Sequence, residues 1–228
     1  ASAETSRQRL QLETLDVLYI HRFDPETPLE ESLGALAELK QQGHIRQIGL
    51  SNFAAWQVVK AAHLVADFGL EIGVIQPMYS LVKRQAEVEI LPMAQDFGIL
   101  VAPYSPLGGG LRTGKYSQGG TGRISEDPRY AARYGQEAMH GAAAGLAALA
   151  ADLGTHPATL AVAWAAAHPS RPTPIISARS AKQLAPPPAA MTYVLTPDTT
   201  AAPAAPPATP APPPPPPRRP GRTPPPRP

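Results

Sequence analysis

The sequence has 228 residues, enough for one medium-sized domain, and a formal net charge of +2, too small to indicate nucleic-acid binding. The absence of cysteine excludes disulfides, thiolate metal sites and cysteine nucleophiles, and we expect no metal site. No basic segment followed by an apolar run stands at the N-terminus, and no apolar stretch approaches the ~20 residues that span a membrane. We therefore expect a cytoplasmic protein.

Proline divides the chain into two regions. Of the 30 prolines, 19 follow Ala185. Residues 1–184 have the composition of a folded domain, whereas residues 185–228 form a low-complexity tail rich in Pro, Ala and Arg, for which we expect disorder or polyproline II. Such a tail can bind an acidic surface or a proline-reading domain, although a solvated tail or an altered reading frame is the simpler interpretation.

Strand-like and helix-like segments alternate along residues 1–184. Apolar, β-rich runs predict strands at residues 16–21, 45–52, 74–80, 99–105 and 173–178. Helical spacing of apolar residues predicts helices at residues 27–43, 54–68, 88–97, 138–153 and 157–168, with a further helix beginning at 180–184. Glycines end the first three helices: Gly43, Gly69 and Gly98. Because a crossover between parallel strands needs a helix-length connection, this alternation indicates an α/β fold with a parallel sheet.

Two architectures fit this alternation. A doubly wound sheet that binds a nucleotide usually carries G-x-G-x-x-G after its first strand, and the Gly108-Gly109-Gly110 triplet lacks this spacing and position. A (β/α)8 TIM barrel instead gathers functional residues at the carboxyl ends of many strands. Polar residues stand at the carboxyl ends of all five predicted strands: His21, Ser51-Asn52, Tyr79-Ser80, Tyr104-Ser105 and 177–179. The sequence therefore favours a barrel, although five strands make only a partial one.

Five strings in this region resemble the aldo-keto reductase superfamily, most of all the bacterial branch that is also similar to potassium-channel β subunits. They are YIHRFDPETPLEESLGAL, GHIRQIGLSNF, VIQPMYSLVKRQAE, PYSPLGGGLRTGKY and PIISARSAKQL. The similarity runs from about Leu10 to Leu184. It implies a (β/α)8 barrel truncated at its N-terminal side, of which residues 1–184 hold strands four to eight, with NADP(H) as cofactor and aldehyde or ketone carbonyls as substrates.

The family reduces carbonyls with an Asp, a Tyr acid, a Lys and a His. The first three belong on strands that this sequence lacks, and only His21 matches the fourth. Strand spacing alone favours a histidine satisfied by a backbone group. The resemblance implies that His21 orients a substrate carbonyl and supports proton donation. We therefore expect impaired activity, and keep two alternatives: a non-catalytic NADP(H)-binding protein, and an interaction protein that uses the Pro/Arg-rich tail.

The resemblance also places the nicotinamide. Ser51, Asn52 and Gln76 would hold its carboxamide, which offers both a donor and an acceptor. Ser51 or Asn52 can equally be helix caps. Tyr104 would stack on the nicotinamide ring, or be a core aromatic with its hydroxyl at the rim.

The remaining matches concern the phosphates and the adenosine. Ser105, Leu107 and Gly109 would lie along the pyrophosphate, where glycines let backbone N–H groups approach closely. Lys115 and Arg123 would reach the phosphates, unless they are surface charges.

The adenosine end departs from the family pattern. Arg179 suits the 2′-phosphate that distinguishes NADP from NAD, and Gln183 would contact the adenosine. The family continues this helix with an acid and an amide, whereas three prolines after Ala185 end it here.

The missing strands also affect assembly. The two outer strands, at residues 16–21 and 173–178, would have exposed edges. Exposed edges of apolar strands favour self-association, and we expect the isolated chain to be marginally stable.

Overall fold

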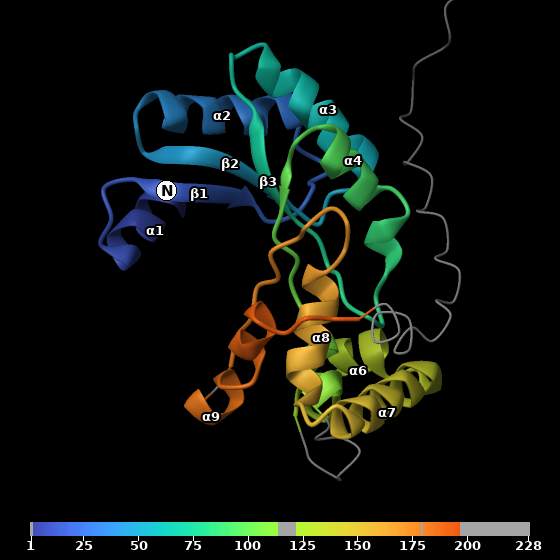
Figure 1. The fold of residues 1–228 in the computed structure, drawn as a ribbon. Helices are drawn as coiled ribbons and strands as arrows, with labels where there is room; N and C mark the ends of the chain where they lie inside the picture. Colours follow the sequence, from blue (N-terminus) through green and yellow to red (C-terminus); the bar gives the residue numbers. More distant parts are fainter. Residues whose placement is uncertain (1, 114–121, 179, 197–228) are drawn as a thin grey trace, which may run out of the picture.

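A parallel four-stranded sheet forms the upper part of the computed structural model, which describes residues 2–113, 122–178 and 180–196 (Figure 1). Its strands follow one another in chain order: β1 (Leu15–Ile20), β2 (Ile45–Ser51), β3 (Ile72–Gln76) and β4 (Leu100–Val101). Three helices connect consecutive strands: α2 (Leu29–Gln41), α3 (Ala55–Ala66) and α4 (Ile90–Asp96). The predicted parallel α/β alternation is confirmed for this region.

The main core lies between the sheet and these three helices. Leu33 of α2, Val58 of α3 and Leu91 of α4 are each at most 1% exposed, and they belong to one cluster with the buried strand residues Ile48 and Ile75. Each helix therefore turns its apolar stripe toward the sheet, as the i, i+3, i+4 spacing of the sequence requires.

The predicted fifth strand is not regular. Thr173 N donates to Val101 O and Ile175 N to Pro103 O, both at 2.8 Å, so the segment lies along β4 without forming an assigned strand. Pro172 and Pro174 alternate with these two residues, and a proline has no N–H to extend the ladder. The prediction of five regular strands was therefore wrong, although the segment occupies the expected position.

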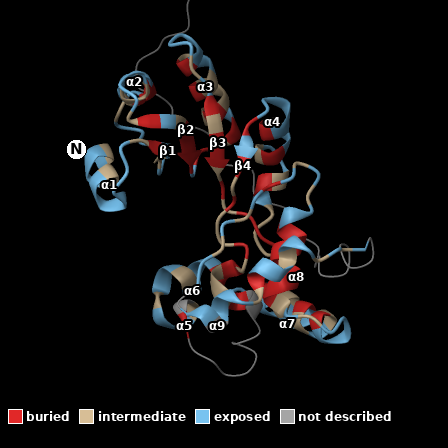
Figure 2. Ribbon diagram, turned by 60° about the vertical axis from the view of Figure 1, so that its left-hand side comes forward, coloured by how far each residue is buried: buried red, intermediate tan, exposed pale blue. Residues whose placement is uncertain are grey.

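A layer of helices lies below the sheet in Figure 1. It contains α5 (Arg123–Glu126), α6 (Pro128–Tyr134), α7 (Glu137–Asp152), α8 (Pro157–Ala166) and the short α9 (Ala181–Leu184). Helix α8 is buried on every side from Ala158 to Ala165, and Leu160 and Trp164 join the main core (Figure 2). A helix that is apolar all round packs inside a protein, and α8 accordingly links the two layers.

Several short elements complete the described chain. Helix α1 (Ser2–Leu10) has no buried residue, and three 3-10 helices are found at η1 (Gln85–Glu87), η2 (Gly108–Thr113) and η3 (Pro187–Met191). Helix α9 ends before the proline triplet, as predicted. The expected disordered tail lies mostly outside the described residues. No single helix among the described residues is long and apolar enough to cross a membrane, and α7 and α8 satisfy that test only jointly, as a pair bent by 104°.

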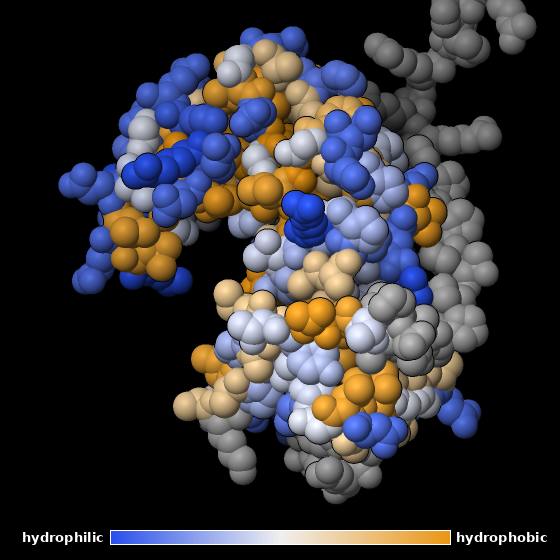
Figure 3. All heavy atoms as spheres, viewed as in Figure 1, coloured by the Kyte–Doolittle hydropathy of each residue, from blue (hydrophilic) through white to orange (hydrophobic). Residues whose placement is uncertain are grey.

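One face of the sheet is partly open. A cavity of about 610 Å³ is lined by strand residues that include Val17 of β1, Gln47 of β2 and Leu100 of β4, and by Ala62 and His63 of α3. Val17 is 37% exposed and Leu100 72% exposed. The space-filling view shows the molecule deeply hollowed on the β1 side, between the sheet and the lower helices (Figure 3). Strand β1 is an edge of the four-stranded sheet, so no described strand pairs with its outer side.

Candidate functional site

The strand tips bring together the polar residues that the sequence singled out. Parallel pairing aligns β1 with β2, β2 with β3, and Ser51 with Gln76. Beyond the regular strands, Tyr104 N donates to Pro77 O at 3.0 Å, and Tyr79 N donates to Tyr104 O at 3.3 Å. The segments after β3 and β4 therefore remain paired past the point where the strands end.

Asn52 connects three of these tips. Its Nδ2 donates to His21 O at 2.8 Å and to Ser51 Oγ at 3.2 Å, and its Oδ1 accepts from the Tyr104 hydroxyl at 2.8 Å. Ser51 Oγ in turn donates to Gln76 O at 2.9 Å. The carboxyl end of the sheet thus brings together five of the predicted site residues: His21, Ser51, Asn52, Gln76 and Tyr104.

The backbone at Asn52 is unusual. Its φ is +57°, in the left-handed region that asparagine tolerates better than most residues. In this conformation the side chain contacts both His21, after β1, and Tyr104, after β4. The alternative that Ser51 or Asn52 caps α3 is not what the structure shows, because Gln57 Oε1 accepts from the N-cap amide of Ala54 at 2.8 Å.

His21 differs from the other members of the group. Its side chain is exposed, and the contact that ties it to the site is made by its backbone carbonyl. The imidazole is therefore accessible to solvent at the end of β1, next to the point where Asn52 and Tyr104 meet.

Tyr104 keeps its proton at neutral pH. Burial raises the pKa of its half-buried hydroxyl, and Arg133 and Arg22 oppose that rise without cancelling it. A neutral phenol can donate the hydrogen bond to Asn52 and leave the ring at the rim of the site. The geometry is compatible with both interpretations of Tyr104, a stacking ring and a core aromatic.

The glycine triplet forms a tight turn immediately after this tip. Ser105 has φ +58°, and Gly108, Gly109 and Gly110 all have positive φ. Gly108 N donates to Ser105 O at 2.9 Å and Gly110 N donates to Leu107 O at 3.1 Å. Two of the three glycine N–H groups therefore already bond within the loop.

Helix α6 explains why Gly109 is glycine. A Cβ at that position would lie 3.0 Å from Tyr130 Cδ1 and 3.1 Å from the Tyr134 ring. The close approach at Gly109 is thus made by α6, a contact that sequence reasoning missed. Asp127 as N-cap and Pro128 at the first helical position were the available signals for this helix, and Tyr130 and Tyr134 lie one turn apart on it.

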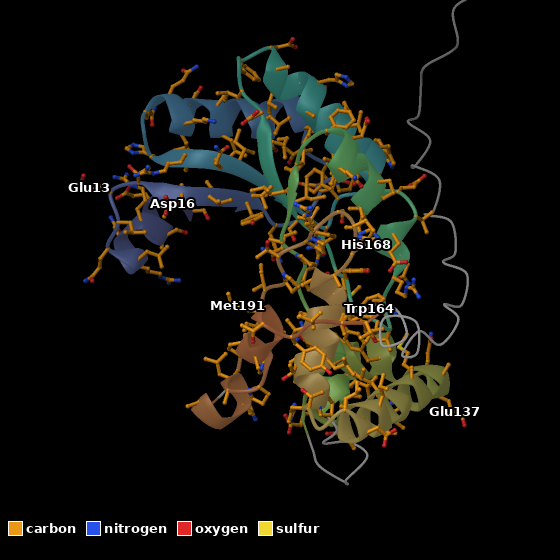
Figure 4. All side chains as sticks on the ribbon, in the orientation of Figure 1. Glu13, Asp16, Glu137, Trp164, His168 and Met191 are labelled. Atoms are coloured by element: carbon orange, nitrogen blue, oxygen red, sulfur yellow. The ribbon has the colours of Figure 1, made fainter. Side chains whose placement is uncertain are left out.

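A second missed cluster anchors the segment after β3. Tyr79 is 1% exposed, and its hydroxyl donates to Glu87 Oε1 at 2.8 Å. Arg84 donates to both oxygens of Glu87, at 2.9 and 2.8 Å. The Trp164 and His168 rings lie against Tyr79, with centroids 5.5 and 6.0 Å away. Figure 4 labels Trp164 on α8 and His168 just beyond the end of that helix. The strand tip is therefore attached to α8.

The remaining predicted cofactor residues are only partly described. Lys115 and Arg179 lie outside the described residues, and Arg123 begins α5 without a described side chain. Gln183 is exposed on α9, where its backbone N–H is capped by Ser180 Oγ at 3.3 Å.

Comparison with known proteins identifies the family. The model described as "Aldo/keto reductase family" matches residues 1–203. This chain belongs to the aldo/keto reductase family. The resemblance read from the sequence motifs is confirmed, and the four parallel strands agree with part of an aldo/keto reductase barrel.

Individual relatives cover different parts of the chain. Aflatoxin B1 aldehyde reductase member 2 of Mus musculus is 43% identical over 114 residues, which are 50% of this chain and 31% of that protein. Aldo-keto reductase family 7 member A3 of Homo sapiens is 42% identical over 114 residues, 50% of this chain and 34% of its own length. The uncharacterized oxidoreductase YrpG of Bacillus subtilis (strain 168) is 36% identical over 184 residues, 79% of this chain and 55% of YrpG. The chain thus spans about a third to about a half of these aldo/keto reductase relatives.

Proposed function

We propose that this chain is the cofactor-binding portion of an NADP-dependent reductase of aldehyde or ketone carbonyls. The observation that carries the proposal is the hydrogen-bonded junction at Asn52, which fixes the tips of β1, β2 and β4 relative to one another. Membership of the aldo/keto reductase family supports it, because barrels of parallel strands build their sites at this end.

The chemistry of the junction suits a nicotinamide carboxamide. Ser51 and the half-buried Gln76 supply hydroxyl and amide groups at adjacent tips, and Asn52 holds those tips in register. The Tyr104 ring lies next to them, where it would stack on the nicotinamide. Bound NADPH would supply the hydride, and the exposed His21 imidazole would orient the carbonyl that receives it.

The rest of the cofactor would follow the chain beyond β4. Ser105, Leu107 and Gly109 would border the pyrophosphate, and Lys115 and Arg123 would pair with phosphates. Arg179 would bind the 2′-phosphate through bidentate hydrogen bonds, and Gln183 would contact the adenosine.

The strand tips supply few side chains that could donate a proton to the reduced carbonyl. The Tyr104 hydroxyl points its proton at Asn52, and the family's Asp, Tyr and Lys match no residue of this chain. General acid catalysis contributes roughly 10²- to 10⁴-fold, so we expect cofactor binding with slow turnover. A non-catalytic NADP(H)-binding protein is the second candidate, favoured by this same geometry.

The test is a fluorescence titration of the full chain with NADPH and NADH. We expect saturable NADPH binding that is tighter than NADH binding, and at least about 10-fold weaker binding by Asn52→Gly, since glycine keeps the backbone angle but removes the amide. Gln11→Gly is the matched control, because Gln11 has φ +56° and lies at the end of α1. Absence of NADPH binding by the unsubstituted chain would contradict the proposal.

Oxidation of NADPH in the presence of a nitrobenzaldehyde separates the two candidates. Turnover above the rate without protein supports the reductase. Binding without turnover supports the non-catalytic alternative.

A further inference from the structure

Tyr134 lies between the two strand tips that carry the proposed nicotinamide and pyrophosphate contacts. It is 0% exposed, and its hydroxyl donates to Met78 Sδ at 3.3 Å across 56 residues of chain. Met78 follows Gln76 by two residues and forms a parallel bridge with Tyr104. The contact therefore reaches the segment that leaves β3.

The ring of Tyr134 meets the segment that leaves β4. Its Cδ1 atom would lie 3.9 Å from a Cβ at Gly108. Gly108 belongs to the glycine loop that Ser105 opens, and Ser105 has φ +58°. One residue of α6 thus contacts both the β3 tip and the loop that follows β4.

The ring of Tyr134 fills the space beneath the loop. Its Cδ2 and Cε2 atoms would lie 3.1 Å from a Cβ at Gly109, and Leu111 and Met139 complete a small buried cluster with it. Any displacement of the ring would release the support of the loop backbone, since close-packed side chains have little space to readjust.

We propose that Tyr134 is a positioning residue that holds the Gln76–Met78 tip and the glycine loop in one fixed relation, so that nicotinamide and pyrophosphate are bound together. The inference rests on the proposed function and adds a residue of α6 to it. Because Tyr134 is fully buried, it acts through Met78 and Gly109 and touches no ligand itself.

The first test compares Tyr134→Phe with Tyr193→Phe in the full chain. Tyr193 packs on the main core and is not part of the Tyr134 cluster. Tyr193→Phe is therefore the matched control for the loss of a tyrosine hydroxyl. Three probes are titrated: NADPH, reduced nicotinamide mononucleotide and adenosine 2′-monophosphate, which has no phosphate in the pyrophosphate position. We expect Tyr134→Phe to weaken the first two about 3- to 10-fold, the equivalent of one hydrogen bond, and to leave adenosine 2′-monophosphate unchanged.

A uniform loss for all three probes would indicate a general structural role and overturn the inference, as would unchanged binding of all three. Met78→Leu should reproduce the effect of Tyr134→Phe, and the double variant should be no worse than either single variant, because both remove the same contact. Additive losses would also count against the proposal.

The second test needs no cofactor. Hydrogen exchange of the Gly108 and Gly110 amides, which bond to Ser105 O and Leu107 O, should become at least about 3-fold faster in Tyr134→Phe, with exchange in β2 unchanged. If the unsubstituted chain binds none of the probes, the proposed function fails, and this exchange still decides the role of Tyr134. Faster loop exchange supports it and unchanged exchange overturns it.

Discussion

The hydroxyl of Tyr104 donates a 2.8 Å hydrogen bond to Oδ1 of Asn52, although 52 residues separate them in the chain. Asn52 also binds the carbonyl of His21 at 2.8 Å. One amide side chain therefore locks the ends of β1, β2 and β4 together. Loss of this amide would leave three tips without their shared partner, and the consequences for stability and for the site can be measured separately.

Substitution of Asn52 should show how much its left-handed backbone conformation affects the free energy of unfolding. Asn52→Gly and Asn52→Ala both remove the amide, but alanine must also adopt φ +57°. We expect Asn52→Ala to have a free energy of unfolding lower than that of Asn52→Gly by about 1 kcal/mol, because a Cβ clashes with the backbone there. Urea unfolding followed by circular dichroism measures the difference. Equal stability of the two variants would show that the backbone at Asn52 relaxes.

The Tyr79–Glu87–Arg84 cluster should respond unequally to its two simplest changes. Tyr79→Phe removes one hydrogen bond and leaves Glu87 with two from Arg84, so we expect a loss of about 1 kcal/mol in the free energy of unfolding. Glu87→Ala leaves the Tyr79 hydroxyl and the Arg84 guanidinium without this partner, so we expect a loss of about 2–3 kcal/mol.

Chemical denaturation of the two variants measures this difference. Val88→Ala is the control, because Val88 is adjacent and 61% exposed, and it should change the free energy of unfolding by less than about 0.5 kcal/mol. If Tyr79→Phe lowered the free energy of unfolding more than Glu87→Ala, Glu87 would not be the central partner of the cluster.

Alkaline pH should destabilise the fold. Burial, followed by the hydrogen bond to Glu87, raises the pKa of Tyr79 above its ordinary value, and burial also raises the pKa values of Tyr104 and Tyr134. Above about pH 10 the unfolded chain loses these phenolic protons while the folded chain retains them. The unfolded state then binds fewer protons, so the free energy of unfolding falls as pH rises.

Urea midpoints at about pH 9 and about pH 11 measure this fall. Tyr79→Phe should show a smaller decrease than the unsubstituted chain, because one of the shifted groups is gone. The same decrease in both proteins would exclude Tyr79 as a source of the pH dependence.

The open face of the sheet should promote self-association. Val17 of the edge strand β1 and Leu100 of β4 are exposed apolar side chains that line the same cavity. We expect Val17→Lys and Leu100→Lys to lower concentration-dependent association in sedimentation experiments, because a charge on an exposed apolar surface opposes its burial against another chain. Val88→Lys is the control, since Val88 is exposed but follows η1 and does not line the cavity. Equal effects of all three variants would point to nonspecific charge repulsion.

Local sequence patterns predicted most of the regular helices and strands. The helix predicted at residues 27–43 is α2, Leu29–Gln41, and Gly43 has φ +75°, as a glycine that ends a helix commonly does. The prediction failed at residues 173–178, where apolar residues indicate a strand but Pro172 and Pro174 remove the N–H groups that a ladder needs. It also missed α6, which is only seven residues long and buries its Tyr134 against residues from distant parts of the chain.

The order of strands and helices and the polar residues at the strand tips could be read from the sequence, because apolar periodicity and helix stops are properties of neighbouring residues. The contacts between the tips depend on the folded chain: Asn52 joins the tips of β1 and β4, Ser51 bonds to the carbonyl of Gln76, and Gly109 makes room for α6. The three hydrogen bonds join residues 25 to 52 positions apart, and no local pattern specifies which distant donor meets which acceptor once parallel strands are aligned.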